Sequence, residues 1–382
     1  MEYSISRPYL VIARLVEQST WGGSYITTFK NIQDPELQKR KIGQSYELFG
    51  KTILSRATDT SDPQFQNDLI AYNRSQELPV DKEFVSLDDL ISIDPKAVLG
   101  PAIHQNAMPL LLKFTQALGN SFQIHVKKNS GSARWKAKPE SWYYLEDGII
   151  TFGVKKGVDV KKYKQICFLI EEKMSELSRL MKQKKLSYKE ASKAADDFIK
   201  EKDPWQFVNL HKVKKYTIVD LSAGGIHHSW EEDPVGHPQG NVLYEVQTDV
   251  DDNTSTIRCF DRGKIKPDGS VRDIHVEDYF SNLDLDPKHN NLDPLLHKKN
   301  DESLLQTPNY SLDALTITKE LLVATGRSFV HFFVVEGNLQ LETTNTTLVV
   351  AQGHSCFVPH AVGSFSLSPV STKTRLLKTY IT

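Results

Sequence analysis

The sequence predicts a mainly β protein of the sandwich or jelly-roll type that carries a helical insertion. Three observations support this fold class. Short apolar runs that alternate with polar residues follow one another from residue 109 to 153. A stretch with helical periodicity then interrupts them between residues 159 and 185. From about Leu321 the tail consists of evenly spaced short strands separated by Gly and Asn turns, a pattern typical of sandwiches and jelly rolls.

The chain has 382 residues, which is enough for two or three packed units. Residues 1 to about 101 are mixed in character, with a turn signal at Trp21-Gly22-Gly23, and indicate no function. The runs PLLLKF, SFQIHV and SWYYLEDGIITFGV follow, with turn signals at Gly119-Asn120 and Asp147-Gly148. They predict an antiparallel meander.

The interruption reads as two helices. Five apolar residues repeat at helical spacing among lysines and glutamates: Ile166, Ile170, Met174, Leu177 and Met181. Ser187 and Glu190 form a capping-box pattern at the start of a second helix. The basic runs could form an anion patch, but lysines interleaved with glutamates are typical of a solvated helix face. We interpret residues 156–204 as a helical insertion.

After Trp205 the β pattern resumes with KKYTIVDLSAGGIHHSW and NVLYEVQTDV. The C-terminal segment has His331 on one strand and a Gly353, Pro359 and His360 fragment further on. One or two unclustered histidines are more typical of a scaffold than of a metal site. The sequence therefore predicts no second metal in this part of the chain.

Composition limits the function classes. Lys and Arg (47) nearly balance Asp and Glu (48), and the net charge of −1 gives no global field for nucleic acid or an anionic membrane. The three cysteines form no CxxC pair, so a metal site would need nitrogen and oxygen ligands. No stretch approaches the roughly 20 apolar residues of a membrane span. These features predict a cytoplasmic protein without nucleic-acid or membrane partners.

The run SFQIHVKK places polar residues on one face of a strand. Phe122, Ile124 and Val126 alternate with Ser121, Gln123 and His125. Residues two apart on a strand lie roughly 6.5 Å apart, so Gln123 and His125 could bind one ion. A lone strand histidine is more often a satisfied core or rim residue.

Two other positions could complete such a site. Glu140 stands just before an aromatic strand, where it could be edge charge or an oxygen ligand. His227 follows the Gly224-Gly225 turn at a strand end, where a ring can point inward or simply occupy the turn.

The combination and order of these motifs resemble type I mannose-6-phosphate isomerase (phosphomannose isomerase), a zinc enzyme of the cupin superfamily. The motifs are PLLLKF, SxQxH, KPExWY, AGGIH, EVQ and TIRCFD, spread from about Pro109 to Tyr279 and interrupted by the insertion. The resemblance continues more faintly through the C-terminal β segment. It implies two cupin-like jelly-roll barrels, one Zn²⁺ per chain, and interconversion of mannose 6-phosphate and fructose 6-phosphate through an enediol.

The resemblance also implies the site residues. The zinc ligands of the family fall on Gln123, His125, Glu140 and His227. Two imidazoles, one carboxylate and one neutral amide leave the ion positively charged and able to polarise a carbonyl or hydroxyl oxygen. The adjacent His228 could compete with His227, although sequence register favours His227.

The family's essential arginine falls on Arg258, and we expect it to stabilise developing oxyanion charge. Its lysine falls on Lys138, a candidate for proton transfer next to the metal. Either residue could instead form a surface salt bridge.

The family's substrate-binding positions fall on Lys113, Ser121, Glu245 and Lys264. Lysine and hydroxyl groups suit a phosphate. Glu245 could hold sugar hydroxyls, act as an acid or base, or pair with Arg258.

The chain departs from the family after His125, where Val126-Lys127-Lys128 replaces Pro-Asp, and after His228, where a longer acidic link follows. Alternatives therefore include a non-catalytic sugar-binding or regulatory metal cupin and an isomerase of another phosphosugar. Non-haem iron chemistry is a further alternative, but a fourth protein ligand argues against it.

The predicted domains are residues 1–155 and 205–290 for the catalytic cupin domain, 156–204 for the insertion, and 291–382 for a C-terminal cupin-like β domain. The sequence indicates a small-molecule phosphosugar as partner and gives no oligomeric state.

Overall fold

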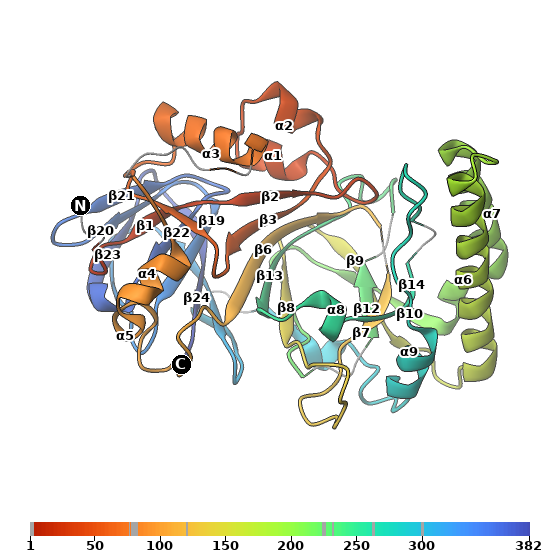
Figure 1. Cartoon of the computed structure of the whole chain (residues 1–382). Coiled ribbons are helices and arrows are strands. Elements are labelled where there is room, and N and C mark those ends of the chain that lie inside the picture. The colour runs from red at the N-terminus through yellow and green to blue at the C-terminus, as the bar shows by residue number, and fades with distance from the viewer. Residues whose placement is uncertain are drawn as a thin grey trace.

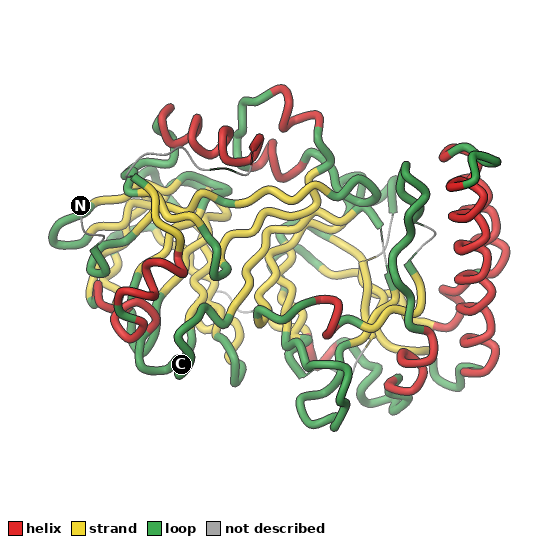
Figure 2. The backbone as a smooth tube through the Cα atoms, viewed as in Figure 1, coloured by secondary structure: helices red, strands yellow, loops and turns green. Residues whose placement is uncertain are grey.

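The computed structural model describes residues 4–75, 77, 83–119, 121–223, 227–230, 233–261, 264–298 and 302–382. Its described strands form four antiparallel sheets. Figure 2 shows the strands filling the middle of the molecule and the helices lying outside them. The mainly β prediction is confirmed.

Two sheets enclose the polar face of the run SFQIHVKK. The first has the strand order β15 (Leu296–His297), β11 (Ile218–Asp220), β8 (Glu140–Tyr144), β13 (Asn241–Thr248), β6 (Leu110–Ala117), β3 (Ile42–Leu48) and β2 (Arg14–Glu17). The second has the order β10 (Val208–Val213), β9 (Gly148–Val154), β12 (His227–Trp230), β7 (Phe122–Ile124) and β14 (Ile257–Phe260). We call them the seven-stranded and the five-stranded sheet.

Two further sheets contain the C-terminal strands. One has the order β16 (Glu302–Gln306), β17 (Ser311–Ile317), β24 (Thr374–Tyr380), β19 (Val330–Glu336), β22 (Ser355–Val358), β1 (Tyr9–Ile12), β4 (Ile53–Ser55) and β5 (Phe84–Ser86). The other has the order β18 (Leu321–Ala324), β23 (Ser364–Pro369), β20 (Leu339–Glu342) and β21 (Thr347–Val350). The first strands of the chain therefore complete a sheet that the last strands build.

The prediction of two jelly-roll barrels is not confirmed. A barrel requires the edge strands of a sheet to pair with each other. Within the described residues, none of the four sheets closes in this way. The strands instead form open sheets that face one another.

One face of the seven-stranded sheet packs on the main core, and the other carries polar side chains in β6 and β13 beside an apolar cluster that Trp142, Tyr144 and Leu243 form with β9. In β6, Leu112 and Phe114 are buried in the main core, where Phe114 packs 5.4 Å from Phe333 of β19 between ring centroids. Lys113, between them, lies on the opposite face. The same alternation in β13 places Glu245 on the face of Lys113, directly across the ladder. This face is turned toward the five-stranded sheet, where Trp142, Tyr144 and Leu243 pack with Ile150 and Phe152 of β9.

Helices cover the remaining surfaces (Figure 1). The N-terminal half contains α1 (Tyr25–Phe29), α2 (Pro35–Lys39), α3 (Pro63–Ser75), α4 (Leu87–Ile93) and α5 (Pro95–Leu99). The long helices α6 (Val160–Lys182) and α7 (Tyr188–Lys202) stand together at the end remote from both termini. The short helices α8 (Asp252–Ser255) and α9 (Val276–Asn282) flank β14. Short 3₁₀ turns span Pro204–Phe207, Asp293–Leu295 and His360–Val362.

The helical insertion forms the two helices that the sequence predicts. Ser187 and Glu190 make the predicted reciprocal capping box at the start of α7. Ile166 and Ile170 of α6 pack with Phe122 and Ile124 of β7. The insertion therefore covers the outer face of the five-stranded sheet, and the polar residues of β7 lie on its inner face.

Candidate active site

The run around β7 presents its residues as the alternation predicts. Phe122 and Ile124 are fully buried beneath the helices. Ser121 and Gln123 lie on the other face, where the Ser121 hydroxyl donates to Gln123 Oε1 at 3.0 Å. His125 follows on the same face and is also buried. The strand thus carries a hydroxyl, an amide and an imidazole into the space between the two sheets.

His125 and Glu140 meet in that space. Nδ1 of His125 donates to the Ser255 carbonyl at 2.7 Å, because a carbonyl can only accept. His125 Nε2 lies 3.3 Å from Glu140 Oε1, and both side chains are at most 2% exposed. Two ligands of a tetrahedral zinc with bonds of about 2.0–2.1 Å are separated by about 3.3 Å. The pair fits a metal, and a carbonyl bond that fixes the ring tautomer is usual for metal-binding histidines.

The rest of the predicted ligand set is partly described. Gln123 lines the same cavity as Glu140. The side chain of His227 lies outside the described residues. The backbone ladder pairs His227 with Ile124 and His228 with Gln123. Within the described part of the chain, no three His, Cys, Asp or Glu side chains form a metal-binding group.

One cavity of about 260 Å³ collects most of the predicted site residues. Eight of them line it: Lys113, Ser121, Gln123, Lys138, Glu140, Glu245, Arg258 and Lys264. His125 is joined to the wall through Glu140. Residues that are up to 151 positions apart in the sequence therefore line the same small cavity.

Lys113 and Glu245 form a buried ion pair, with Nζ 2.9 Å from Oε2. Burial alone would lower the pKa of Lys113, but the carboxylates of Glu245 and Asp252 outweigh it and raise that pKa. Glu245 therefore pairs with the lysine directly opposite it on β6, and the alternative pairing with Arg258 is wrong.

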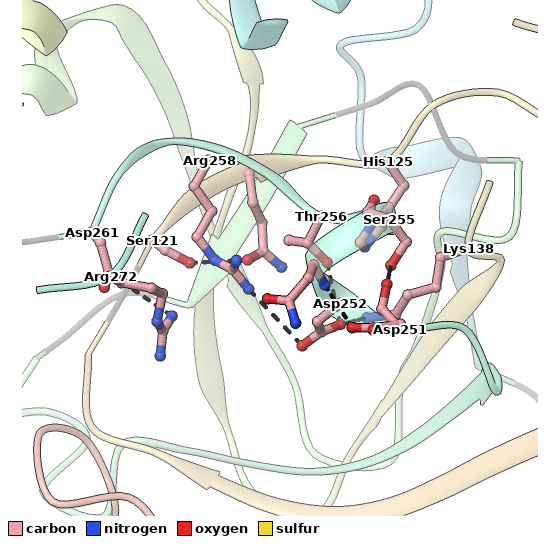
Figure 3. A network of polar contacts seen from close by, with 12 residues as sticks. Ser121, His125, Lys138, Asp251, Asp252, Ser255, Thr256, Arg258, Asp261 and Arg272 are labelled. Carbon is pink, nitrogen blue, oxygen red and sulfur yellow. Dashed lines mark hydrogen bonds and ion pairs between the residues drawn. The ribbon is translucent and has the colours of Figure 1, made fainter. Parts of the chain in front are cut away.

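Asp252 lies between the two predicted catalytic cations (Figure 3). Its Oδ1 accepts from Lys138 Nζ at 2.7 Å, and its Oδ2 lies 4.0 Å from Arg258 Nη2. Lys138 Nζ also lies 3.3 Å from Glu140 Oε2. Burial would raise the pKa of Asp252, but Lys138 and Lys113 outweigh it and lower that pKa. Asp252 is therefore ionised at neutral pH.

Sequence reasoning missed Asp252 and Arg272. Asp252 begins α8, the short helix in the long spacing between Glu245 and Arg258, and the Asp-rich text there is a weak signal. Arg272 lines the cavity beside Lys264 and lies 3.4 Å from Asp261. It stands 14 positions after Arg258 beyond a turn, and no local pattern marks it. Arg272 and Lys264 also line a second cavity of about 400 Å³ beside α6, so they form part of the wall between the two.

Comparison with known proteins places this site in a known fold. Residues 300–380 match the family model described as mannose-6-phosphate isomerase, cupin domain. The whole chain is similar to the crystal structure of mannose 6-phosphate isomerase from Bacillus subtilis, with a TM-score of 0.65, 16% identity, and coverage of 98% of this chain and 99% of that one. No curated protein sequence matches it.

Two other solved structures give the same result. A zinc-bound mannose 6-phosphate isomerase aligns with a TM-score of 0.66 and 17% identity, over 98% of this chain and 99% of that one. A single-residue mutant of the phosphomannose isomerase from Salmonella typhimurium aligns with a TM-score of 0.67 and 16% identity over the same shares. The predicted resemblance is confirmed for the fold and for the C-terminal cupin domain.

None of the helices in the described ranges combines the length and apolar character needed to cross a membrane.

Proposed function

We propose that this chain, which has the fold of mannose 6-phosphate isomerases, is a zinc-dependent aldose–ketose isomerase. Its reaction interconverts mannose 6-phosphate and fructose 6-phosphate through an enediol. The observation that carries the proposal is one cavity lined by several cations, by the half-exposed Asp252 and by Glu140, whose carboxylate lies 3.3 Å from His125 Nε2. An enediol mechanism needs these groups together, since it moves a proton between adjacent carbons while charge develops on their oxygens.

His125, Glu140 and Gln123 would hold the zinc, with a fourth ligand from the start of β12. The ion would supply a Lewis acid that polarises the carbonyl or hydroxyl oxygens of the sugar. His227 is the ligand implied by the family motif, whereas the backbone ladder sets His228 opposite Gln123.

The other residues that line the cavity have separate catalytic and binding roles in this proposal. Glu140 and Glu245 are each 2% exposed, whereas the side chain of Asp252 is 55% exposed. Asp252 is the most exposed of the three carboxylates that line the cavity, and we assign it the role of proton acceptor, which its ionised form can fill. Arg258 donates hydrogen bonds to the oxygen on which negative charge develops.

Lys138 is held by two carboxylates, at 2.7 Å from Asp252 and 3.3 Å from Glu140. An ammonium in this position orients Asp252 and can donate a proton to an enediolate oxygen. Glu245 accepts hydrogen bonds from sugar hydroxyls, while Lys113, Ser121 and Lys264 bind the phosphate.

A coupled assay for fructose 6-phosphate from mannose 6-phosphate tests the proposal. The protein is assayed with its zinc quantified, then after chelation, then after zinc is restored. We expect turnover that disappears with the metal and returns with it. A zinc-replete protein that does not turn over mannose 6-phosphate would refute the assignment and direct the search to other phosphosugars or to a binding role.

Zinc stoichiometry identifies the fourth ligand without any assay of activity. We expect that either His227→Ala or His228→Ala lowers the zinc bound per chain, while the other variant binds zinc normally. Full zinc binding by both variants would exclude the start of β12 from the metal site.

A further inference from the structure

A short segment of residues 265–272 joins β14 to α9 and packs against the helical insertion. Ile265 packs in a small core with Leu177, Ala191 and Ala195 of α6 and α7, with Val271 against its edge. The Ser178 hydroxyl donates to the Gly269 carbonyl at 2.6 Å. Gly269 has a φ of 80°, which favours glycine. The Lys266 amide donates to the Ser270 carbonyl at 2.9 Å and the Gly269 amide to the Lys266 carbonyl at 2.8 Å, which closes the turn. The insertion thus fixes the path of the 265–272 segment.

This segment carries Arg272 into the wall of the substrate cavity. Arg272 lines the cavity together with Ser121 and Arg258, and its guanidinium lies 3.4 Å from Asp261. Burial lowers the pKa of Arg258, and the nearby positive charge of Arg272 lowers it further. Two guanidinium groups that face one volume repel each other unless an anion lies between them.

The charges of the cavity wall are not balanced. Within the described residues, five cationic side chains line the cavity against three carboxylates, an excess of two positive charges. Lys113 is paired with Glu245 and Lys138 with Asp252. Arg258, Lys264 and Arg272 lie at one end, where Asp252 is 4.0 Å from Arg258 and the buried Asp261 lies 4.0 Å from Lys264 and 3.4 Å from Arg272. With Asp261 counted, five cations face four carboxylates, and the remaining positive charge favours an anion such as a phosphate monoester, which carries about −1.5 to −2 charge at pH 7.

We propose that Arg272 is a specificity-determining residue that binds the phosphate of the sugar, and that the 265–272 segment and the helices α6 and α7 position it. The inference deepens the proposed function, on which it rests for the identity of the ligand. The proposal gives the helical insertion a function, because α6 and α7 pack against the segment that positions the Arg272 guanidinium. A planar guanidinium suits a phosphate because it can donate two parallel hydrogen bonds.

Arg272→Gln tests the inference, with Arg179→Gln as the matched control, since Arg179 is an exposed arginine of α6. Binding of inorganic phosphate is measured by calorimetry on the zinc-loaded proteins. We expect Arg272→Gln to bind phosphate about ten- to a hundredfold more weakly, as for loss of a hydrogen bond to a charged group. Arg179→Gln should bind like the wild type, and Arg272→Lys should recover part of the affinity.

Kinetics separate a phosphate contact from general damage. For Arg272→Gln, KM for mannose 6-phosphate should rise by a similar factor, while kcat/KM for unphosphorylated mannose stays within about twofold of the wild type. Phosphate affinity within twofold of the wild type would overturn the inference. Equal losses on mannose and mannose 6-phosphate would overturn it too, because they indicate a damaged fold.

The phosphate measurement also separates this inference from the proposed function. A wild-type protein that lacks isomerase activity but loses phosphate affinity on Arg272→Gln would refute the reaction and support the role of Arg272. A wild-type protein that turns over mannose 6-phosphate, together with an unaffected Arg272→Gln variant, would support the reaction and refute the role of Arg272.

Discussion

Arg258 lies opposite Gln123 in the ladder between β14 and β7, so the strand that carries a proposed metal ligand also positions the proposed oxyanion donor. Its side chain is 13% exposed and faces Asp252 at 4.0 Å. If Arg258 donates only to charge that develops in the transition state, Arg258→Ala should lower kcat by about 10²–10³-fold with a smaller change in KM. Steady-state kinetics in the coupled assay measure both values.

Arg179→Ala is the control for this variant, and both proteins should bind as much zinc as the wild type. A change in KM alone would mean that Arg258 binds the substrate uniformly and does not stabilise the transition state. A sugar-binding cupin would have no turnover to lose in the first place.

Single residues also mark where sequence reasoning succeeded and where it stopped. Gln123 and Glu140 could be identified because each stands in a short ordered motif, and they do line one cavity. Arg272 could not, because its position depends on contacts between the 265–272 segment and a helix about 90 residues earlier. The pairing of Lys113 with Glu245 depends on a ladder register that the motifs leave open.

At the scale of elements, the Ser178 hydroxyl is one of the links between α6 and the 265–272 segment. Its bond to the Gly269 carbonyl is buried, at 2.6 Å. Ser178→Ala leaves that carbonyl without this donor, at a net cost of about 0.5–1.5 kcal/mol. We expect Arg272 to be held less often in its binding position, so KM for mannose 6-phosphate should rise about two- to tenfold with kcat nearly unchanged.

Ser281→Ala gives a matched control in α9, since Ser281 donates to the Glu277 carbonyl within its own helix. It should leave KM unchanged. An equal rise of KM in both variants, or a fall in kcat with Ser178→Ala, would show that the link does not act through Arg272.

Elements defined by local pattern could be predicted, and those defined by distant pairing could not. Helix α6 buries Ile166, Ile170 and Leu177 as its periodicity indicates. In contrast, β1 pairs with β22, about 350 residues later, and nothing in the sequence of either strand identifies its partner. The N-terminal region, whose sequence indicates no function, thus supplies strands to two different sheets.

At the scale of the whole molecule, the two halves share one core. The main cluster of buried apolar residues includes strands of the seven-stranded sheet and of the sheet that contains β1 and β22. The Tyr244 hydroxyl of β13 meets His331 Nδ1 of β19 at 3.1 Å across this junction. Nearby, the fully buried Lys30 pairs with Glu47 at 2.7 Å, and His354 Nε2 lies 3.2 Å from the Lys30 carbonyl. The core therefore contains two histidines next to a buried cation.

Those histidines make the stability of the fold sensitive to acid. Burial, reinforced by Lys30, lowers the pKa of His331 and of His354 to about 3. Unfolded histidines titrate near 6.5, so between about pH 6.5 and 3 the unfolded chain binds more protons than the folded one, and stability falls as pH falls. Each buried histidine contributes up to about 1.4 kcal/mol per pH unit in that window.

His331→Gln and His354→Gln should therefore flatten the dependence of unfolding free energy on pH, even where they lower stability at pH 7. Denaturant unfolding of the apo-protein between pH 4 and 8, a range chosen to span most of the window, measures this slope. The exposed His104→Gln should leave the slope unchanged. The prediction is contradicted if both core variants have the same slope as the wild type. The rings would then stay neutral in the unfolded chain as well, or water would reach them in the folded chain. In either case the shared core would not be the acid-sensitive part of the molecule.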